Sequence, residues 1–472
     1  MIEMLFPISV VLFILTIGLL AINPVLGIPL LFISKPFIDT TFEHPVLFDF
    51  RMTELIGVLV PALILCHMIL ASREESFSRM PLKGMWVVYV SYVFFFSLLI
   101  VFQEDLRSGA NVFFRHFNGL VGFYMVQAFF LPPQRRVWLL RSLIVAGLFP
   151  VGIGFIQMAT GVTWKVEHSE GLLRNIGLWH DAVNIRQYML QTLLVLLLYG
   201  AVYTGRQVWK KLGVFIYMIG TVIVCIKAFS KSGMATLVLW TGCWGLLFRK
   251  YAVFVIPMMG ILLFGGLLAA DLLGSVLQVF QKEIGFLQGD IAGTRTFAGR
   301  WHSWQALMAE WQTYDWFLKI FGSGRVAIGA HNDYLQLLFH GGFLGLSCYV
   351  MLLGTIGVKL FLNLRRALTP MNMAAGMAFL MWMVDTIGLV PSAYPGFQWF
   401  VWGLVGLSLR VQESEDLVIP SSQPVATDRE SEAHHNSAIG RPEGSPKKFP
   451  LLIPPVLDGP DGSQKKFPLQ VS

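Results

Sequence analysis

Residues 84–103 read GMWVVYVSYVFFFSLLIVFQ, a run of twenty residues without one charged side chain. An α-helix needs about 20 apolar residues to cross the hydrocarbon core of a bilayer. This stretch therefore predicts a membrane-spanning helix. Similar apolar runs recur along the chain, near 4–21, 53–71, 112–131, 137–157, 187–204, 212–228, 232–248, 251–274, 333–360, 371–390 and 395–409.

The composition points to the same class of protein. Hydrophobic residues make up 55% of the chain and charged residues 13%, and the mean hydropathy is +0.64. An average soluble chain carries about 25% charged residues. An ordinary soluble domain, a disordered chain and a fibrous protein are therefore excluded. We expect an all-α, polytopic transmembrane bundle of about 12 spans with one long outward loop.

The net charge of +7 has two readings. A basic chain can bind nucleic acid, but membrane proteins also retain cations on their cytoplasmic side. We expect the second and no nucleic-acid partner. The chain has four cysteines, Cys66, Cys225, Cys243 and Cys348. They all lie in apolar runs and form no Cys-x-x-Cys pair, so we expect no metal or redox role for them.

Basic residues mark every second short loop. Because such loops stay in the cytoplasm, they orient the bundle. The loops at 104–111, 158–186, 229–231, 275–330 and 391–394 then face outward. The cytoplasmic loops carry Arg73, Arg79 and Lys83, then Arg135 and Arg136, then Arg206, Lys210 and Lys211, then Arg249 and Lys250, and finally Arg365 and Arg366.

The two ends of the chain differ from the rest. The proline-containing run 24–36 is a thirteenth span, a re-entrant segment or part of a broken first span. The first run lacks a preceding basic segment and a cleavage site, so we expect a retained helix.

Residues 411–472 are too polar to form a core, and their basic clusters suit anionic lipid. We expect a bundle over 1–410 and a disordered cytoplasmic tail over 411–472.

Two outward segments carry cations next to apolar runs. Lys231 lies in the short turn Phe229-Ser-Lys-Ser-Gly-Met234, either as a snorkelling lysine or as a fixed cation at the mouth of the bundle. Arg300 precedes tryptophans at helical spacing, which predicts an amphipathic helix on the membrane surface or on the bundle. A structural ion pair of Arg300 with Glu310 or Asp290 is the alternative.

A third segment runs from Gly322 into the span at 333–360. It delivers Arg325, His331, Asn332 and Tyr334 to the top of that span. A histidine at the beginning of a helix is usually part of a cap, but this polar cluster is denser than a cap requires. The loop 158–186 adds further polar residues that line a cleft or solvate the end of the bundle, among them Arg174 and Arg186.

The third segment resembles the signature of the O-antigen ligase and polymerase superfamily. That signature is a histidine followed by Asn, Ser or Gln, then nine residues, then Gly-x-x-Gly. Here it reads His331-Asn332, residues 333–341 and Gly342-Phe-Leu-Gly345. Its position, after the longest outward loop and at the beginning of a late span, is similar to that of the family.

Two other stretches, Ser230-Lys-Ser-Gly233 and Gly299-Arg300-Trp301, are also similar to family motifs, and the resemblance covers roughly residues 170–410. The family usually has an arginine where Lys231 stands. Lysine keeps the charge but loses the planar fork that grips phosphate with two hydrogen bonds.

The resemblance implies a fold similar to membrane glycosyltransferases of the GT-C type, in the bacterial inner membrane with a periplasmic site. It implies transfer of a glycan from undecaprenyl diphosphate to an acceptor sugar, most simply lipid A–core, without a cofactor or metal. His331 would be the base, and Arg300 and Lys231 would stabilise the leaving diphosphate. The residues expected to bind substrate are Asn332, Tyr334, Arg174, Arg186 and Arg325.

Other functions remain open at this stage. A polymerase of O-antigen, capsule or exopolysaccharide differs from a ligase only in its acceptor. A transporter usually shows repeated halves with matched broken helices, and we find no second broken segment to match 24–36.

Overall fold

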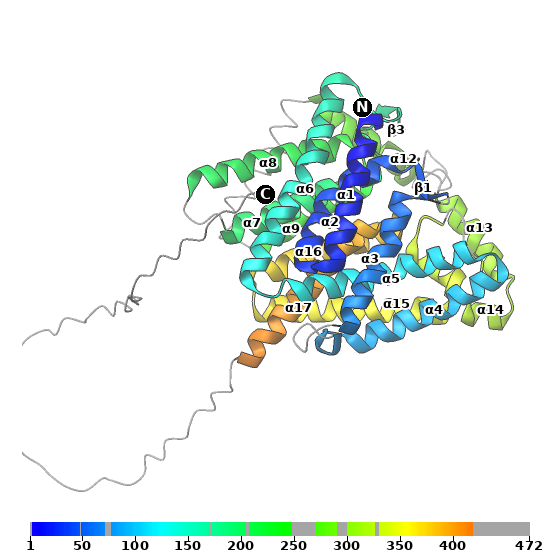
Figure 1. The fold of residues 1–472 in the computed structure, drawn as a ribbon. Coiled ribbons are helices and arrows are strands. Elements are labelled where there is room, and N and C mark those ends of the chain that lie inside the picture. Colours follow the sequence, from blue (N-terminus) through cyan, green and yellow to red (C-terminus); the bar gives the residue numbers. More distant parts are fainter. Residues whose placement is uncertain are drawn as a thin grey trace, which may run out of the picture. The chain divides into compact units, whose positions relative to one another are not determined.

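The structure is a computed structural model, and it describes residues 2–47, 49–70, 77–169, 171–203, 207–247, 270–289, 300–325 and 330–418. These residues form 16 helices and two short strand pairs (Figure 1). Seven of the helices are long and apolar enough to cross a membrane. The prediction of a polytopic, all-α membrane protein is therefore confirmed at this coarse level.

The long helices account for most of the predicted apolar runs. Eleven of the twelve runs fall on a helix, and the twelfth, 251–274, lies mostly outside the described residues. The helices are α1 (Ile2–Ile22), α3 (Met52–Leu70), α4 (Lys83–Gln103), α5 (Leu106–Phe129), α6 (Pro133–Thr160), α7 (Ala182–Tyr203), α8 (Val208–Lys227), α9 (Lys231–Leu247), α15 (Asp333–Arg366), α16 (Pro370–Gly388) and α17 (Pro395–Val418).

The predicted number of about 12 spans is not confirmed, because seven helices of the described residues meet the requirements of a span. The seven candidates are α1, α3, α4, α6, α7, α8 and α15. One of the others, α5, carries charged or polar residues such as Arg115 and Asn118, which lower its hydropathy. Its polar groups find partners inside the bundle instead, as when Asn118 Nδ2 donates to Gly57 O at 3.0 Å.

The remaining elements are short. They are α2 (Pro24–Ile38), α11 (Ala270–Val279), α12 (Gln281–Leu287), α13 (Arg300–Gln312), α14 (Trp316–Phe321), the 3₁₀ helices η1 (Asp39–Thr41), η2 (Phe77–Arg79) and η6 (Pro391–Ala393), and the strands β1 (Pro45–Leu47), β2 (Phe50–Arg51), β3 (His168–Ser169) and β4 (Leu172–Leu173). β1 pairs antiparallel with β2, and β3 with β4.

The run 24–36 is a separate helix beside α1. The Asn23 side chain accepts hydrogen bonds from two backbone amides at the beginning of α2, and Pro24 occupies the first helical turn. Fifteen residues rise about 22 Å, which is less than the roughly 30 Å of a bilayer core. A hydrogen bond of 2.9 Å between Thr16 Oγ1 and Ser34 Oγ joins the two helices.

The predicted tail begins inside the last helix. α17 continues to Val418, and the compact unit of the chain ends at Ile419. The second unit, Pro420–Ser472, lies outside the described residues, and so does the predicted disorder of that segment.

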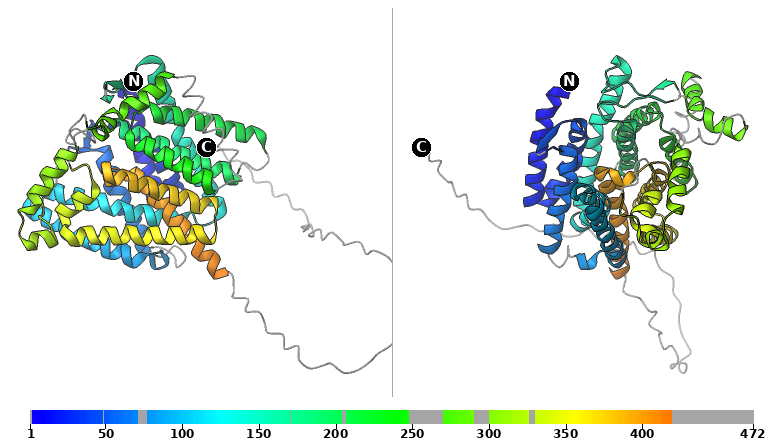
Figure 2. Two further views of the ribbon diagram at one scale, coloured as in Figure 1. Left: turned by 180° about the vertical axis from the view of Figure 1, so that it is seen from behind. Right: turned by 90° about the vertical axis from the view of Figure 1, so that its right-hand side faces the viewer.

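The centre of the bundle is the contact between α5 and α17. A Cβ on Gly122 would lie 2.7 Å from the Trp399 Cα, and a Cβ on Gly406 would lie 2.4 Å from the Phe123 carbonyl oxygen. Such contacts exist only because small residues let two helices approach closely. The views in Figure 2 show how the long helices pack around this pair.

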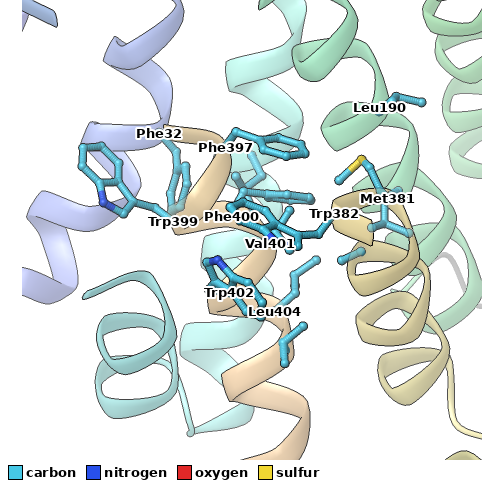
Figure 3. Close-up of a cluster of buried hydrophobic side chains, with 14 of the residues drawn as sticks. Phe32, Leu190, Met381, Trp382, Phe397, Trp399, Phe400, Val401, Trp402 and Leu404 are labelled. Carbon is cyan, nitrogen blue, oxygen red and sulfur yellow. The ribbon is translucent and has the colours of Figure 1, made fainter. Parts of the chain in front are cut away.

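Aromatic side chains fill the space around this crossing (Figure 3). Trp382 of α16 stacks on Phe397 of α17, with ring centroids 5.9 Å apart. Trp399 is fully buried, and its Nε1 donates a hydrogen bond of 2.8 Å to Asn118 Oδ1. The polar atom of the indole is thereby satisfied inside the apolar core.

α15 bends at Gly342, the first glycine of the Gly-x-x-Gly motif. Its φ is +60°, and a Cβ there would lie 2.3 Å from the carbonyl oxygen of Ile320. Gly322 touches the same bend from the other side, because its Cβ would lie 2.0 Å from the His340 carbonyl oxygen. Gly342 of the motif and Gly322 at the end of α14 thus allow α14 to pack against α15.

We predict that Gly342→Ala prevents correct folding. The left-handed backbone alone costs about 1–3 kcal/mol for a residue other than glycine, and the clash with Ile320 adds to that cost. The yield of monodisperse protein in detergent and its midpoint of thermal unfolding measure the effect. Gly354→Ala is the matched control, since a Cβ at Gly354 meets nothing within 4 Å. Equal stability of the two variants would contradict the role assigned to the bend.

Candidate functional site at one end of the bundle

The candidate residues gather where α7, α9, α13 and α15 begin and α16 ends, which we call the site end of the bundle. Direct contacts show the convergence. Asn332 Nδ2 donates to the Ile387 carbonyl oxygen at 3.0 Å, and Arg186 Nη1 donates to Ser232 Oγ at 2.5 Å. Segments far apart in the sequence are thereby joined at the end of α16.

Arg186 forms a buried ion pair with Asp385. Its Nη1 and Nη2 donate to the two carboxylate oxygens at 2.6 and 2.7 Å, and both side chains are fully buried. This parallel pair of charge-assisted hydrogen bonds is the strong geometry for arginine. Arg186 therefore holds α7, α9 and α16 together, and both of its Nη groups already have partners.

Arg174 lies beside the turn that leads into α9. Its Nε donates to the Ala228 carbonyl oxygen at 2.9 Å, and its Nη1 pairs with Glu167. Desolvation lowers the pKa of Arg174, while the charges of Glu167 and Asp181 oppose that change. Phe229 in the same turn has a φ of +46°, which is uncommon for a large side chain. Arg174 fixes this turn from outside.

Arg300 opens α13 and reaches the last turn of α16, where its Nη1 donates to the Gly388 carbonyl oxygen. Desolvation lowers the pKa of its guanidinium, and the charges of Arg174 and Arg186 lower it further. An arginine still remains protonated at neutral pH. In the part of the chain that the structure describes, Arg300 forms no ion pair with Glu310. The other predicted partner, Asp290, lies outside the described residues.

α13 begins where the sequence predicted an amphipathic helix. Leu307 and Trp311 pack against Ala330 and Phe339 near the beginning of α15. Trp304 Nε1 donates a hydrogen bond of 2.6 Å to the Ala330 carbonyl oxygen. The helix therefore rests on the bundle along this face, whereas Trp301 is 43% exposed.

His331 precedes α15 in a left-handed backbone conformation, with φ of +43°. Histidine tolerates this region better than most residues, but such strain is concentrated at functional sites. The residue is exposed. Desolvation by its surroundings lowers the pKa of the imidazole below the usual value, and the charge of Arg300 lowers it further. The ring is therefore neutral at pH 7 and can accept a proton.

Asn332 and Tyr334 tie α15 to α16. Asn332 Oδ1 accepts the backbone amide of Leu335 at 3.0 Å, which makes Asn332 the N-cap of α15. The Nδ2 of the same side chain donates the hydrogen bond to the Ile387 carbonyl oxygen. The hydroxyl of Tyr334 accepts a hydrogen bond of 3.2 Å from Thr386 Oγ1. Both residues thus set the position of His331 relative to the end of α16.

Lys231 and Arg325 differ from the group around Arg300. Lys231 Nζ donates to both oxygens of Glu283 in α12, at 2.6 and 2.7 Å, so its charge is balanced. Arg325 is exposed, and its charge acts on Tyr314. Within the described ranges, Arg325 has no hydrogen bond or ion pair with the other candidates.

Sequence analysis overlooked the acidic partners. Asp385 lies within a predicted span, and an ionisable residue inside a span is itself a signal of function or of a structural pair. Glu283 lies in the long loop, where nothing in the sequence singles it out. In the described part of the chain, no group of three or more His, Cys, Asp and Glu side chains could hold a metal ion.

Comparison of the chain with known families and with curated proteins gives no match. The description of the site therefore depends on its geometry.

We predict that Asp385→Asn strongly destabilises the protein. Losing one partner of a buried ion pair costs about 3–5 kcal/mol, because the other charge stays buried. Thermal unfolding in detergent measures the change. Glu413→Gln is the control, since Glu413 pairs with Lys359 at 3.5 Å while 41% exposed, and such pairs contribute about 0–1 kcal/mol. Similar losses in both variants would show that the buried pair has no special role.

Proposed function

We propose that the protein transfers a glycan from a polyprenyl diphosphate carrier to an acceptor sugar at the site end of the bundle. The acceptor we propose is lipid A–core, and the site end is proposed to face the periplasm of the bacterial inner membrane. The supporting observation is that Arg300 and Asn332, the neighbour of His331, bind the adjacent carbonyl oxygens of Gly388 and Ile387, so that the charge of Arg300 acts on His331. A cation beside a neutral base is what this reaction requires.

The proposed reaction needs charge stabilisation at the leaving group. The bond between the anomeric carbon and the diphosphate breaks, and negative charge grows on the phosphate oxygens. Among the described residues, the guanidinium of Arg300 donates only to Gly388, and its other N–H groups are proposed to bind those oxygens. Preorganised donors of this kind lower the barrier because they need no reorganisation during the reaction.

The reaction also needs a base for the acceptor hydroxyl, whose oxygen forms the new bond to the anomeric carbon. His331 is the candidate, because its lowered pKa keeps the imidazole neutral. The strained backbone at His331 and the cap formed by Asn332 hold the ring at the end of the bundle. No cofactor or metal is assigned a step in this proposal.

We predict that His331→Ala abolishes transfer while leaving the amount of folded protein unchanged, because His331 is exposed and caps nothing itself. The assay combines purified protein in detergent, carrier-linked glycan and lipid A–core, and counts product per protein. His302→Ala is the control, since His302 is an exposed histidine on α13. Wild-type turnover by His331→Ala would exclude the histidine as base. Product on a carrier-linked repeat in place of lipid A–core would identify a polymerase.

We predict that Arg300→Lys loses about 100-fold or more of the turnover, because lysine lacks the planar fork and a lost charge-stabilising donor costs that much. Arg410→Lys is the matched control, because Arg410 also donates to a backbone carbonyl, that of Arg79. Full activity of Arg300→Lys would show that Arg300 only anchors α13.

The pH dependence gives a second test of the pair. The charge of Arg300 lowers the pKa of His331, so Arg300→Gln should raise it. Transfer needs the neutral imidazole and falls as the pH drops through that pKa. The acid limb of the residual activity of Arg300→Gln should therefore lie at higher pH than that of wild type, measured between about pH 5 and pH 8. An unchanged acid limb would show that the charge of Arg300 does not affect the group whose titration limits activity.

Lys231 is tested through its partner. If Lys231 serves the leaving group, Lys231→Ala should lose most transfer and Glu283→Gln should retain it, since the cation then stays in place. If the pair only holds α12 on α9, both variants should lower thermal stability by similar amounts with equal turnover per folded protein.

A further inference from the structure

A cavity of about 810 Å³ lies at the site end, apart from the residues assigned above. It is open on one side and is lined by residues of α2, α3, α5 and α7, by β2, and by the segment that leads into α17. Neither His331 nor Arg300 lines it. Such a volume lies within the range of small-molecule sites, which are largely apolar with a few well-placed polar groups.

Two amide side chains that line this cavity each carry one buried atom with no hydrogen-bond partner among the described residues. Gln187 is only 4% exposed, and its Nε2 has no hydrogen bond in the described structure. Asn184 lies three residues earlier on the same face of α7, and its Oδ1 is also unpaired. Buried polar atoms of native proteins nearly always have partners. Together they hold one unused donor and one unused acceptor in the wall of the cavity.

Four cations line the cavity. Lys35 pairs with Asp39, and Arg107 pairs with Glu54 at 3.2 Å, so these two are balanced. Among the described residues, neither the exposed Arg51 nor the partly buried Arg115 has an ion pair. No carboxylate of the described residues lies within ion-pair distance of Arg115. Asp333 acts on Arg115 only from a longer range, while its Oδ1 accepts a hydrogen bond of 2.7 Å from Ser392.

The rest of the wall is rich in aromatic rings, including Phe42, Phe114 and Tyr394. The carbon–hydrogen faces of a sugar ring are apolar and pack on such surfaces, whereas its hydroxyls need the donors and acceptors that the two amides offer. Tyr394 also connects the cavity with the catalytic candidates. Its hydroxyl donates to Asp181 at 3.4 Å, and it lies within electrostatic reach of Arg186 and Arg300.

We infer that this cavity binds a sugar residue carrying a negative charge, with the anion on Arg115 and the hydroxyls on Gln187 and Asn184. The inference rests on the proposed function for the origin of the sugar, which would be a residue of the transferred or accepting glycan. The binding site itself is defined by residues that the transfer chemistry does not use.

The test is saturation-transfer difference NMR on the full chain in detergent micelles, with D-glucuronate and D-glucose as the observed probes and inorganic phosphate as a competitor. Glucuronate should show saturation of its ring protons and bind more tightly than glucose, and phosphate should displace it only in large excess. Arg115→Gln should weaken glucuronate binding about tenfold or more, as expected for loss of a charged hydrogen bond. Gln187→Met, of similar size, should also weaken it. Lys359→Gln at the opposite end of the bundle is the control.

Three results would overturn the inference. They are no glucuronate binding to the wild type, wild-type affinity in both Arg115→Gln and Gln187→Met, and half-displacement of glucuronate by an equal concentration of phosphate. If Arg115→Gln does not fold, Gln187→Met decides alone. Transfer activity without glucuronate binding would refute this site but not the proposed function. Glucuronate binding without transfer activity would support this site and refute the proposed function.

Discussion

The buried ion pair between Arg186 and Asp385 is the interaction on which the site end depends. Both side chains are fully buried, and two parallel hydrogen bonds join them. Asp385 lies three residues before Gly388, so the pair fixes the last turn of α16. Arg300 and Asn332 both bind carbonyl oxygens of that turn. The positions of α13 and of His331 therefore follow from a contact made deeper in the bundle.

Much of the fold was predictable because apolar runs of the required length are a local property of the sequence. The runs matched helices from α1 to α17, and the segment 24–36 formed its own short helix. The number of spans was less predictable. α5 contains Arg115 and Asn118, whose partners come from other helices, and no local pattern shows how such a helix lies in the bundle.

The candidate site was predictable to a different degree. His331 and Arg300 were identified from short motifs, and the structure brings them within electrostatic reach of each other. Arg186 was also identified, but its partner Asp385 is 199 residues away in the sequence. Such long-range pairs depend on tertiary packing, which the sequence does not show. The sequence therefore predicted a free cation at a position where the structure contains an ion pair without net charge. Lys231 and Glu283 repeat this pattern.

The segment from α13 to α14 is attached to the bundle at both of its ends. Arg300 secures the beginning on α16, and Gly322 secures the end against the bend of α15. Because the two ends are held, the chain between them loses little further entropy when its sequence or length changes. Trp316 and Phe317 lie in this segment and are exposed. Leu307 and Trp311 hold the other face of the segment on α15, so substitutions at the exposed Trp316 and Phe317 can vary the outer surface while the helices beneath keep their packing.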